Sequence, residues 1–209
     1  MSPAKVDAVS QIQTSTLDSP VGARSHALLY DALMVVGASL FVAACARVTL
    51  PLPFTPVPLT LQNFAVLVVG LVLGARRGAA ALALYVAEGA AGLPVFSSAG
   101  PGGLAHLFGP TGGYLLAYPA AAYVAGWLAA RNRSSFFRAL GACVAAEAVL
   151  FSGGIAWLML LTGATLAQAA AAGLVPFVFA EVIKVLLAAE TASRWSRWRT
   201  ARNPGQPAS

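Results

Sequence analysis

Residues 175–190 read VPFVFAEVIKVLLAAE, an almost wholly apolar run in which Glu181 and Lys184 stand three positions apart. Residues with this spacing lie on one face of an α-helix. A helix in water would expose such a pair to solvent, but the apolar neighbours indicate a bilayer. Charged residues inside a membrane segment are rare and usually mark a substrate or ion pathway. The run therefore predicts a membrane-spanning helix that carries part of a functional site.

The composition of the whole chain agrees with a membrane protein. Of its 209 residues, 58% are hydrophobic and only 10% are charged, and the mean hydropathy is +0.76. Soluble domains contain about 25% charged residues. Cys45 and Cys143 both lie in apolar runs. We therefore interpret them as small buried hydrophobic residues rather than as a disulfide.

Six apolar segments are candidates for membrane spans, although the second and third are short. A span needs about 20 mainly apolar residues. Between the second and third segments, Arg76 and Arg77 stand between glycines, which predicts a tight turn, because two cations near the middle of the bilayer would be costly. The sequence predicts an all-α integral membrane protein with six transmembrane helices, at about 27–48, 60–74, 78–92, 112–130, 139–161 and 173–193.

The basic residues predict the orientation of these spans. Eleven of the 13 lie before the first span, between spans two and three, between spans four and five, or after the sixth. The three intervening loops contain no Lys or Arg. Because cytoplasmic loops are enriched in these residues, both termini are predicted to be cytoplasmic. The net charge of +6 is thus a topology signal and does not indicate nucleic-acid binding.

The two ends of the chain differ in composition from the membrane domain, which we place at residues 26–193. Residues 1–25 are polar and contain no apolar core of signal-peptide length, so we expect a disordered cytoplasmic tail. Residues 194–209 form a basic cytoplasmic tail that ends in the loose sequence NPGQPAS.

The first basic-free loop, residues 49–64, reads TLPLPFTPVPLTLQNF. Prolines cannot donate backbone hydrogen bonds and have a fixed φ. Four of them in this loop predict an extended segment near polyproline II, which ends where Thr60 can cap the second span. A rigid apolar loop of this kind is typical of a lid or a wall, and a stiff connector is the alternative.

The second basic-free loop is long and rich in glycine, and residues 92–114 read GLPVFSSAGPGGLAHLFGPTGGY. Irregular backbone near membrane depth persists only where it is buried in protein or lines a cavity. We therefore expect this loop to fold inward and to offer backbone N–H and C=O groups. His106 stands beside Leu and Phe, and we expect it to be structural, with a ligand or proton carrier as the alternative.

The combined motifs resemble the BioY family of biotin transport proteins. The matching runs are PLPFTPVPLTLQNFAVLVVGLVLG, GLPVF and GPTGGY, followed by the acidic-x-x-Lys pattern of Glu181 and Lys184. The resemblance covers about residues 28 to 192. Two departures stand out, because the family often has Asp at position 181, and because Ser97, Ser98 and Thr111 occupy a region where some members use an Asn and an Arg.

The resemblance implies the substrate-binding, or S, component of an energy-coupling factor (ECF) transporter in a bacterial cytoplasmic membrane. It implies six helices and biotin held near the outer surface, with no enzymatic activity and no cofactor beyond the transported ligand. ATP hydrolysis is supplied by a separate module, a transmembrane coupling subunit with two ATPases. Small residues on the first span are the expected contact with that module, and the candidates are Ala38-x-x-x-Val42 and Ser39-x-x-x-Ala43.

Biotin has an apolar bicyclic ring, a ureido group with two N–H donors and one carbonyl, and a valerate carboxylate. We expect Glu181 to accept a ureido N–H, and Lys184 to bind either the ureido oxygen or the valerate. A pocket for such a ligand is mostly apolar with a few placed polar groups. Backbone N–H groups of Gly112 and Gly113 are further candidate donors. The remaining candidates are Phe54, Phe96 and Tyr114 as walls, Gln62 and Asn63 as amides, and Ser97 and Thr111 in the glycine-rich loop.

Two other classes of function are weaker alternatives. In an ion- or proton-coupled secondary transporter, Glu88, Glu147 and Glu181 would form a relay. Such transporters usually contain two similar halves, and the sequence contains no convincing internal repeat. A membrane enzyme would need a nucleophile and base within reach or a metal-ligand set. The two histidines and two cysteines are too scattered for either arrangement.

Overall fold

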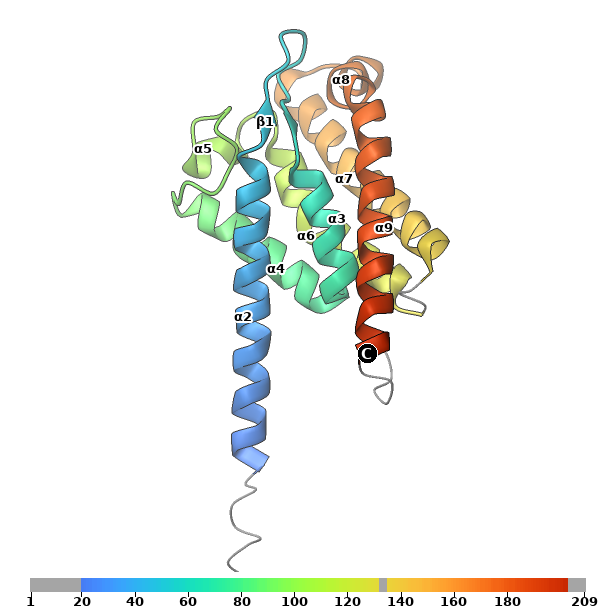
Figure 1. The fold of residues 1–209 in the computed structure, drawn as a ribbon. Coiled ribbons are helices and arrows are strands. Elements are labelled where there is room, and N and C mark those ends of the chain that lie inside the picture. The colour runs from blue at the N-terminus through green and yellow to red at the C-terminus, as the bar shows by residue number, and fades with distance from the viewer. Residues whose placement is uncertain (1–19, 132–134, 203–209) are drawn as a thin grey trace, which may run out of the picture. The chain divides into compact units, whose positions relative to one another are not determined.

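A computed structural model of the chain describes residues 20–131 and 135–202 and is predominantly helical (Figure 1). The chain divides into two compact units, Met1–Met34 and Val35–Ser209. Helix α2 (Pro20–Ala46) runs from the first unit into the second. Residues 1–19 of the predicted N-terminal tail lie outside the described residues, whereas residues 20–25 are already helical. The packing and the site described below belong to the second unit.

The major helices coincide with the six predicted spans. Three stretches, Ser25–Ala46, Phe136–Thr162 and Leu166–Arg202, are long and apolar enough to cross a membrane, and Gln62–Leu73 is apolar but shorter. The last helix continues to Arg202, beyond the predicted end at residue 193, and the remaining tail, 203–209, lies outside the described residues. Besides α2, these helices are α3 (Gln62–Leu73), α4 (Ala75–Ala90), α6 (Gly112–Ala129), α7 (Phe136–Thr162) and α9 (Val178–Arg202).

The proline-rich loop forms a hairpin, and the prediction of an extended polyproline II segment is wrong. Strand β1 (Thr49–Leu50) pairs antiparallel with β2 (Leu59–Thr60). The four prolines all lie in the connecting residues 51–58, since proline cannot donate a ladder hydrogen bond. The Thr60 hydroxyl accepts the N–H of Gln62 at the start of α3 (3.3 Å). The N-cap of α3 is Leu61, which makes no side-chain capping bond, so the prediction that Thr60 caps this helix is wrong.

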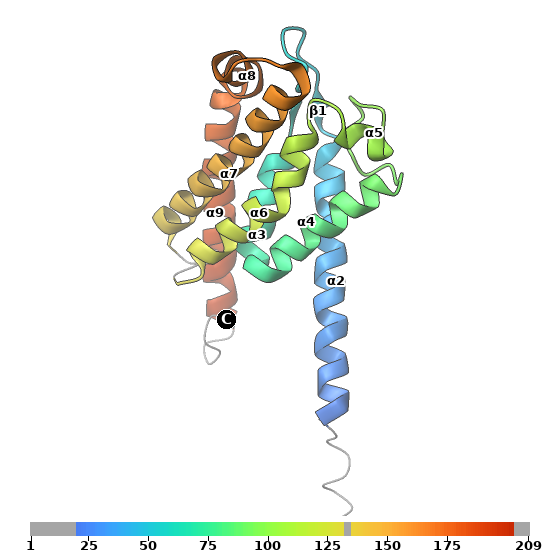
Figure 2. The same ribbon diagram turned by 180° about the vertical axis from the view of Figure 1, so that it is seen from behind.

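Short helices close the same end of the second unit as the hairpin (Figures 1 and 2). Within α8 and its cap, the Thr165 hydroxyl accepts the N–H of Gln168, whose side chain in turn accepts the N–H of Thr165. This reciprocal capping box fixes the start of α8. The elements at this end are α5 (Gly103–Leu107), α8 (Leu166–Gly173) and the 3₁₀ turn η1 (Val175–Phe177).

Helix α6 is the centre of the packing, since it contacts α7, α4 and α3, while α9 packs against α3 and α7. Small residues permit these close approaches. A Cβ on Gly126 would lie 2.3 Å from the backbone nitrogen of Ala75 and 2.5 Å from the carbonyl carbon of Gly74. Gly74 itself has φ +83° and makes the tight turn between α3 and α4 that the sequence predicted. Cys45 and Cys143 are buried free thiols, also as predicted.

The Gly126→Ala variant is expected to lose about 1–3 kcal/mol of unfolding free energy, because a methyl group would meet backbone atoms that cannot rotate away. Its melting temperature in detergent should fall accordingly. The control is Gly141→Ala in α7, where an added Cβ meets nothing within 4 Å. Equal melting temperatures for the two variants would contradict the tight contact between α6 and the α3–α4 turn.

The described arginines gather mainly at the end opposite the hairpin. The α3–α4 turn, the end of α6, the start of α7 and the end of α9 all lie there (Figures 1 and 2). These places contain most of the described basic side chains. Arg47 is an exception, since it follows α2 at the hairpin end and donates to the backbone oxygen of Pro94.

The residues predicted to contact a coupling module mostly face this chain's own interior. Ser39 and Val42 are fully buried and Ala38 is nearly so, whereas Ala43 is half-buried. The Ser39 hydroxyl donates to the carboxylate of Glu88 on α4 (2.5 Å). Three of the four predicted contact residues therefore cannot reach a partner in this conformation, because helix packing within the second unit covers them.

Candidate functional site

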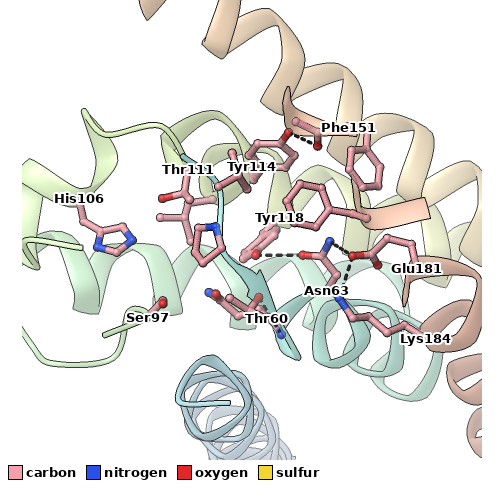
Figure 3. A pocket seen from close by; sticks show the side chains of 16 residues that line it. Thr60, Asn63, Ser97, His106, Thr111, Tyr114, Tyr118, Phe151, Glu181 and Lys184 are labelled. Carbon is pink, nitrogen blue, oxygen red and sulfur yellow. Dashed lines mark hydrogen bonds and ion pairs between the residues drawn. The ribbon is translucent and has the colours of Figure 1, made fainter. Parts of the chain in front are cut away.

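A pocket of mixed polar and aromatic character lies beneath the hairpin and the short helices (Figure 3). Its lining comes from the β2 region, the start of α3, the glycine-rich loop, α6, α7, the α8–η1 segment and α9. Seven of the predicted site residues line it together: Gln62, Asn63, Ser97, Thr111, Tyr114, Glu181 and Lys184. The glycine-rich loop folds inward, as predicted, to bring Ser97 and Thr111 to the site.

The charged pair of α9 forms a buried ion pair at one side of this pocket. Lys184 Nζ lies 2.8 Å from Glu181 Oε1, and each side chain is only 9% exposed. Asn63 Nδ2 donates to the same oxygen (3.2 Å), and the Tyr118 hydroxyl donates to Asn63 Oδ1 (3.2 Å). This chain of hydrogen bonds connects α9 with α3 and α6 (Figure 3). Glu181 Oε2 is buried and has no hydrogen-bond partner among the described residues.

The energetics of this ion pair point to a role beyond stability. Two charges removed from water gain little net stability from each other, and apolar replacements are often as stable. One carboxylate oxygen is already occupied by Lys184 and Asn63, while the other still requires donors. Because a buried acceptor without a donor is costly, the arrangement is suited to a ligand that brings an N–H or O–H group to Glu181 Oε2.

Aromatic side chains form the apolar walls of the pocket. The Tyr114 hydroxyl donates to the backbone oxygen of Gly173 (2.7 Å), which fixes its ring. That ring meets Phe151 edge to face, with 5.9 Å between centroids. Phe177 from η1 also lines the pocket and is buried. These rings offer a surface for a flat or cyclic apolar group.

His106 lines the pocket, so the expectation that it is purely structural is incomplete. The side chain is 4% exposed, its ring centroid lies 5.1 Å from that of Phe96, and Nδ1 has no partner among the described residues. Burial lowers the pKa of His106. The imidazole is therefore neutral at pH 7, and it can accept or donate one hydrogen bond at the pocket rim.

Acidification should destabilise the fold through His106. The pKa of His106 is lower in the folded chain than in the unfolded chain. Below about pH 6.5 the unfolded chain therefore binds more protons, and the free energy of unfolding falls. We expect the melting temperature of the ligand-free protein to drop from pH 7 to pH 5, and His106→Gln to reduce that drop. The exposed His26 provides the control, His26→Gln. If His106→Gln leaves the pH dependence of the melting temperature unchanged, the conclusion that His106 is buried in its neutral form is wrong.

Four predicted site residues lie elsewhere. Phe54 is 69% exposed, and Phe96 packs against Tyr85 and His106 behind the lining, so neither belongs to the described pocket wall. The N–H of Gly112 already donates to the backbone oxygen of Gly109 (3.1 Å). A Cβ on Gly113 would lie 2.2 Å from Trp157 Cβ. The Gly112 N–H is thus already used, and Gly113 serves the close packing of α6 against α7, so neither glycine lines this pocket.

Sequence reasoning missed several residues that line the pocket. Tyr118 stands four positions after Tyr114, so both lie on one face of α6, and this spacing could have identified it. Thr60 stands two positions before Gln62, so its place in the pocket could have been inferred from that of Gln62. Phe151 and Phe177 lie in uniformly apolar stretches that contain no signal for a site.

The pocket is contracted in this conformation, with a cavity of about 40 Å³. Pockets that hold drug-sized ligands measure about 300–1,000 Å³. The Thr55 hydroxyl in the hairpin loop donates to the backbone oxygen of Ala172 in α8 (2.6 Å), which connects two of the segments above the pocket. A ligand larger than a few water molecules therefore does not fit the pocket in this conformation.

The chain matches the sequence model of the BioY family over residues 14–201. It is 37% identical to the biotin transporter BioY of Thermotoga maritima, over 83% of this chain and 95% of that protein. It is 36% identical to the probable biotin transporter BioY of Pyrococcus horikoshii, over 79% and 91% of the two chains. It is also 36% identical to the biotin transporter BioY of Rhizobium etli, over 75% and 87%.

A solved structure shares the fold. The crystal structure of the S-component for biotin from an ECF-type ABC transporter superimposes with a TM-score of 0.75, covers 82% of this chain and 93% of that one, and is 24% identical. The overall arrangement of the helices thus recurs in that solved structure.

Proposed function

This chain belongs to the BioY family, and from that premise we propose that it binds biotin and takes it up across a bacterial cytoplasmic membrane as the S component of an ECF transporter. The observation that carries the proposal is the buried Glu181–Lys184 pair at a partly aromatic pocket, with one carboxylate oxygen left without a donor. The three relatives described above, all named as biotin transporters or probable biotin transporters, support the choice of ligand.

The chemistry of biotin fits the polar groups of the pocket. A ureido N–H donates to Glu181 Oε2, which has no partner among the described residues. Lys184 binds either the ureido oxygen or the valerate carboxylate, and both are acceptors for an ammonium group. The bicyclic ring lies against Tyr114 and Phe151, whose rings line the same pocket. Hydrogen bonds to ionised groups of this kind are the stronger class in proteins.

We further propose that all six major helices cross the membrane, with the hairpin end outside and both termini in the cytoplasm. The gathering of arginines at the opposite end supports this orientation. The pocket then opens toward the exterior, from which biotin enters. Because the cavity is contracted, movement of the hairpin loop relative to α8 accompanies entry.

Uptake against a gradient needs an energy source, and we propose that a transmembrane coupling subunit with two ATPases supplies it. Ser39 and Val42 are buried within this chain, so we assign the contact to the exposed side of α2. Within the second unit that side carries Val36, Leu40 and Phe41, all of which are exposed and apolar. Membrane helices pack through such surfaces by van der Waals contact.

Uptake of labelled biotin into cells that can neither synthesise nor import it tests the proposal. Cells that express this chain together with a coupling module should accumulate biotin, and cells that express the module alone should not. A protonophore applied at fixed ATP should leave the uptake intact. Loss of uptake on protonophore addition would instead indicate a proton-coupled secondary transporter, and absence of uptake in both strains would refute the function.

A further inference from the structure

Glu147 on α7 is a buried acid for which the proposed binding chemistry has no use. The residue is 8% exposed, and neither carboxyl oxygen has a hydrogen-bond partner among the described residues. Glu147 and Glu181 line the same crevice, and their carboxyl groups interact electrostatically. Glu181 Oε2 also lacks a donor. Neighbouring buried acceptors are thus left without donors, an arrangement that is costly in a protein interior.

The surroundings of Glu147 contain too little positive charge for two carboxylates. Helix α9 contributes Glu181 and Lys184, α6 contributes Tyr118, and α7 itself contributes Cys143. Lys184 is the one cation among these neighbours, and its ammonium group is already paired with Glu181 Oε1. With both acids ionised, the cluster would hold a net negative charge away from water. An uncompensated buried charge is strongly destabilising.

The other side of Glu147 faces an apolar crevice. This crevice has a volume of about 440 Å³, lies between α7 and α9, and includes Val144, Val182 and Leu186 in its lining. Glu147 and Glu181 are the only charged residues among its described lining residues. A carboxylate directed toward such a surface would have neither a counter-ion nor a hydrogen-bond donor, and this situation favours the neutral form of a carboxyl group.

We propose that Glu147 is a positioning residue that keeps its proton and donates it in a hydrogen bond to Glu181 Oε2. The proton stays on Glu147, so Glu181 remains the carboxylate and the cluster with Lys184 is neutral overall. Each carboxylate oxygen has two lone pairs. Oε1 accepts from Lys184 and Asn63. Oε2 accepts from Glu147 and retains one lone pair for a ligand N–H.

The consequence for binding rests on the proposed biotin function. Glu147→Gln places a neutral amide donor of similar shape beside Glu181, so biotin affinity should stay within about twofold of the parent. Glu147→Leu removes the donor and leaves Glu181 free to turn, so affinity should fall about tenfold or more. Equal affinities for the two variants, or a greater loss with Gln than with Leu, would contradict the positioning role.

Infrared spectroscopy tests the proton directly and without biotin. The parent and Glu147→Gln are purified from biotin-free medium in an ester-free detergent, so that no lipid or ligand carbonyl overlaps. The parent-minus-variant spectrum should contain the carbonyl band of a protonated carboxylic acid, which shifts when glutamate carries ¹³C. The control is Glu190→Gln, because Glu190 is paired with Arg194 and Arg197 and is therefore ionised. No such band should be lost in that variant.

The outcomes distinguish this inference from the proposed function. If the band is absent from the difference spectrum while the parent binds biotin, Glu147 is ionised and the inference is wrong. If the band is present but the parent fails to bind biotin, the proton is where we infer it and the proposed ligand is wrong.

Discussion

Replacing Lys184 with alanine is expected to weaken biotin binding well over tenfold. The Lys184 ammonium group lies 2.8 Å from Glu181 Oε1 in a nearly closed environment. Truncating one partner of a buried, hydrogen-bonded charge pair costs about 2–5 kcal/mol. The loss includes the contact to the ureido oxygen or valerate and the cost of a buried carboxylate that no longer has its cation. Isothermal titration calorimetry on the purified variant measures the change in Kd.

A second ion pair on the same helix provides a matched control. Glu190 pairs with Arg194 near the cytoplasmic end proposed for α9, and both side chains are substantially exposed. Exposed pairs contribute about 0–1 kcal/mol. Glu190→Ala should therefore leave biotin affinity unchanged. A Lys184→Ala affinity within twofold of the parent would show that Lys184 does not hold the ligand.

Glu181→Ala is expected to have an effect at least as large, on both stability and binding. The variant removes the acceptor for the ureido N–H and the direct partner of the buried Lys184 cation. Breaking a buried pair in this way costs about 3–5 kcal/mol of folding free energy. We expect a lower melting temperature and no measurable biotin binding.

Two further variants separate the loss of binding from the loss of stability. Glu181→Asp keeps the carboxylate and matches the residue that the family often has, so it should retain binding far better than alanine. The double variant Glu181→Ala, Lys184→Met removes the unpaired cation, so its melting temperature should recover toward that of the parent while binding stays absent. Biotin binding by the folded double variant would contradict the site.

The sequence was sufficient to predict the helical architecture for physical reasons that act locally. Apolar run length predicted the six major helices, and the glycine-flanked Arg76–Arg77 pair predicted the turn between α3 and α4. The prediction for the proline-rich loop was wrong because the strand pairing at its base depends on contacts between residues 49–50 and 59–60. No residue pattern in the loop itself encodes that pairing.

Only some residues of the candidate site could be predicted from the sequence. Charged and amide side chains in apolar surroundings, such as Glu181 and Asn63, stand out in the sequence and could therefore be identified as candidate site residues. Their mutual contact, between residues 118 positions apart, became visible only in the packing of α3 against α9. Phe54 was misassigned because a loop residue's side chain can point either way. Glu147 was named only as a member of the relay in the alternative secondary transporter, and its position near the Glu181–Lys184 pair came from the packing of α7 against α9.

Equilibrium binding of biotin to the purified, folded chain tests most directly whether the α9 ion pair is held in place for this ligand. We predict saturable binding tighter than about 1 µM, which corresponds to about −8.2 kcal/mol. A protein that melts cooperatively and keeps its helical circular dichroism, yet gives no saturable signal with biotin, would contradict it.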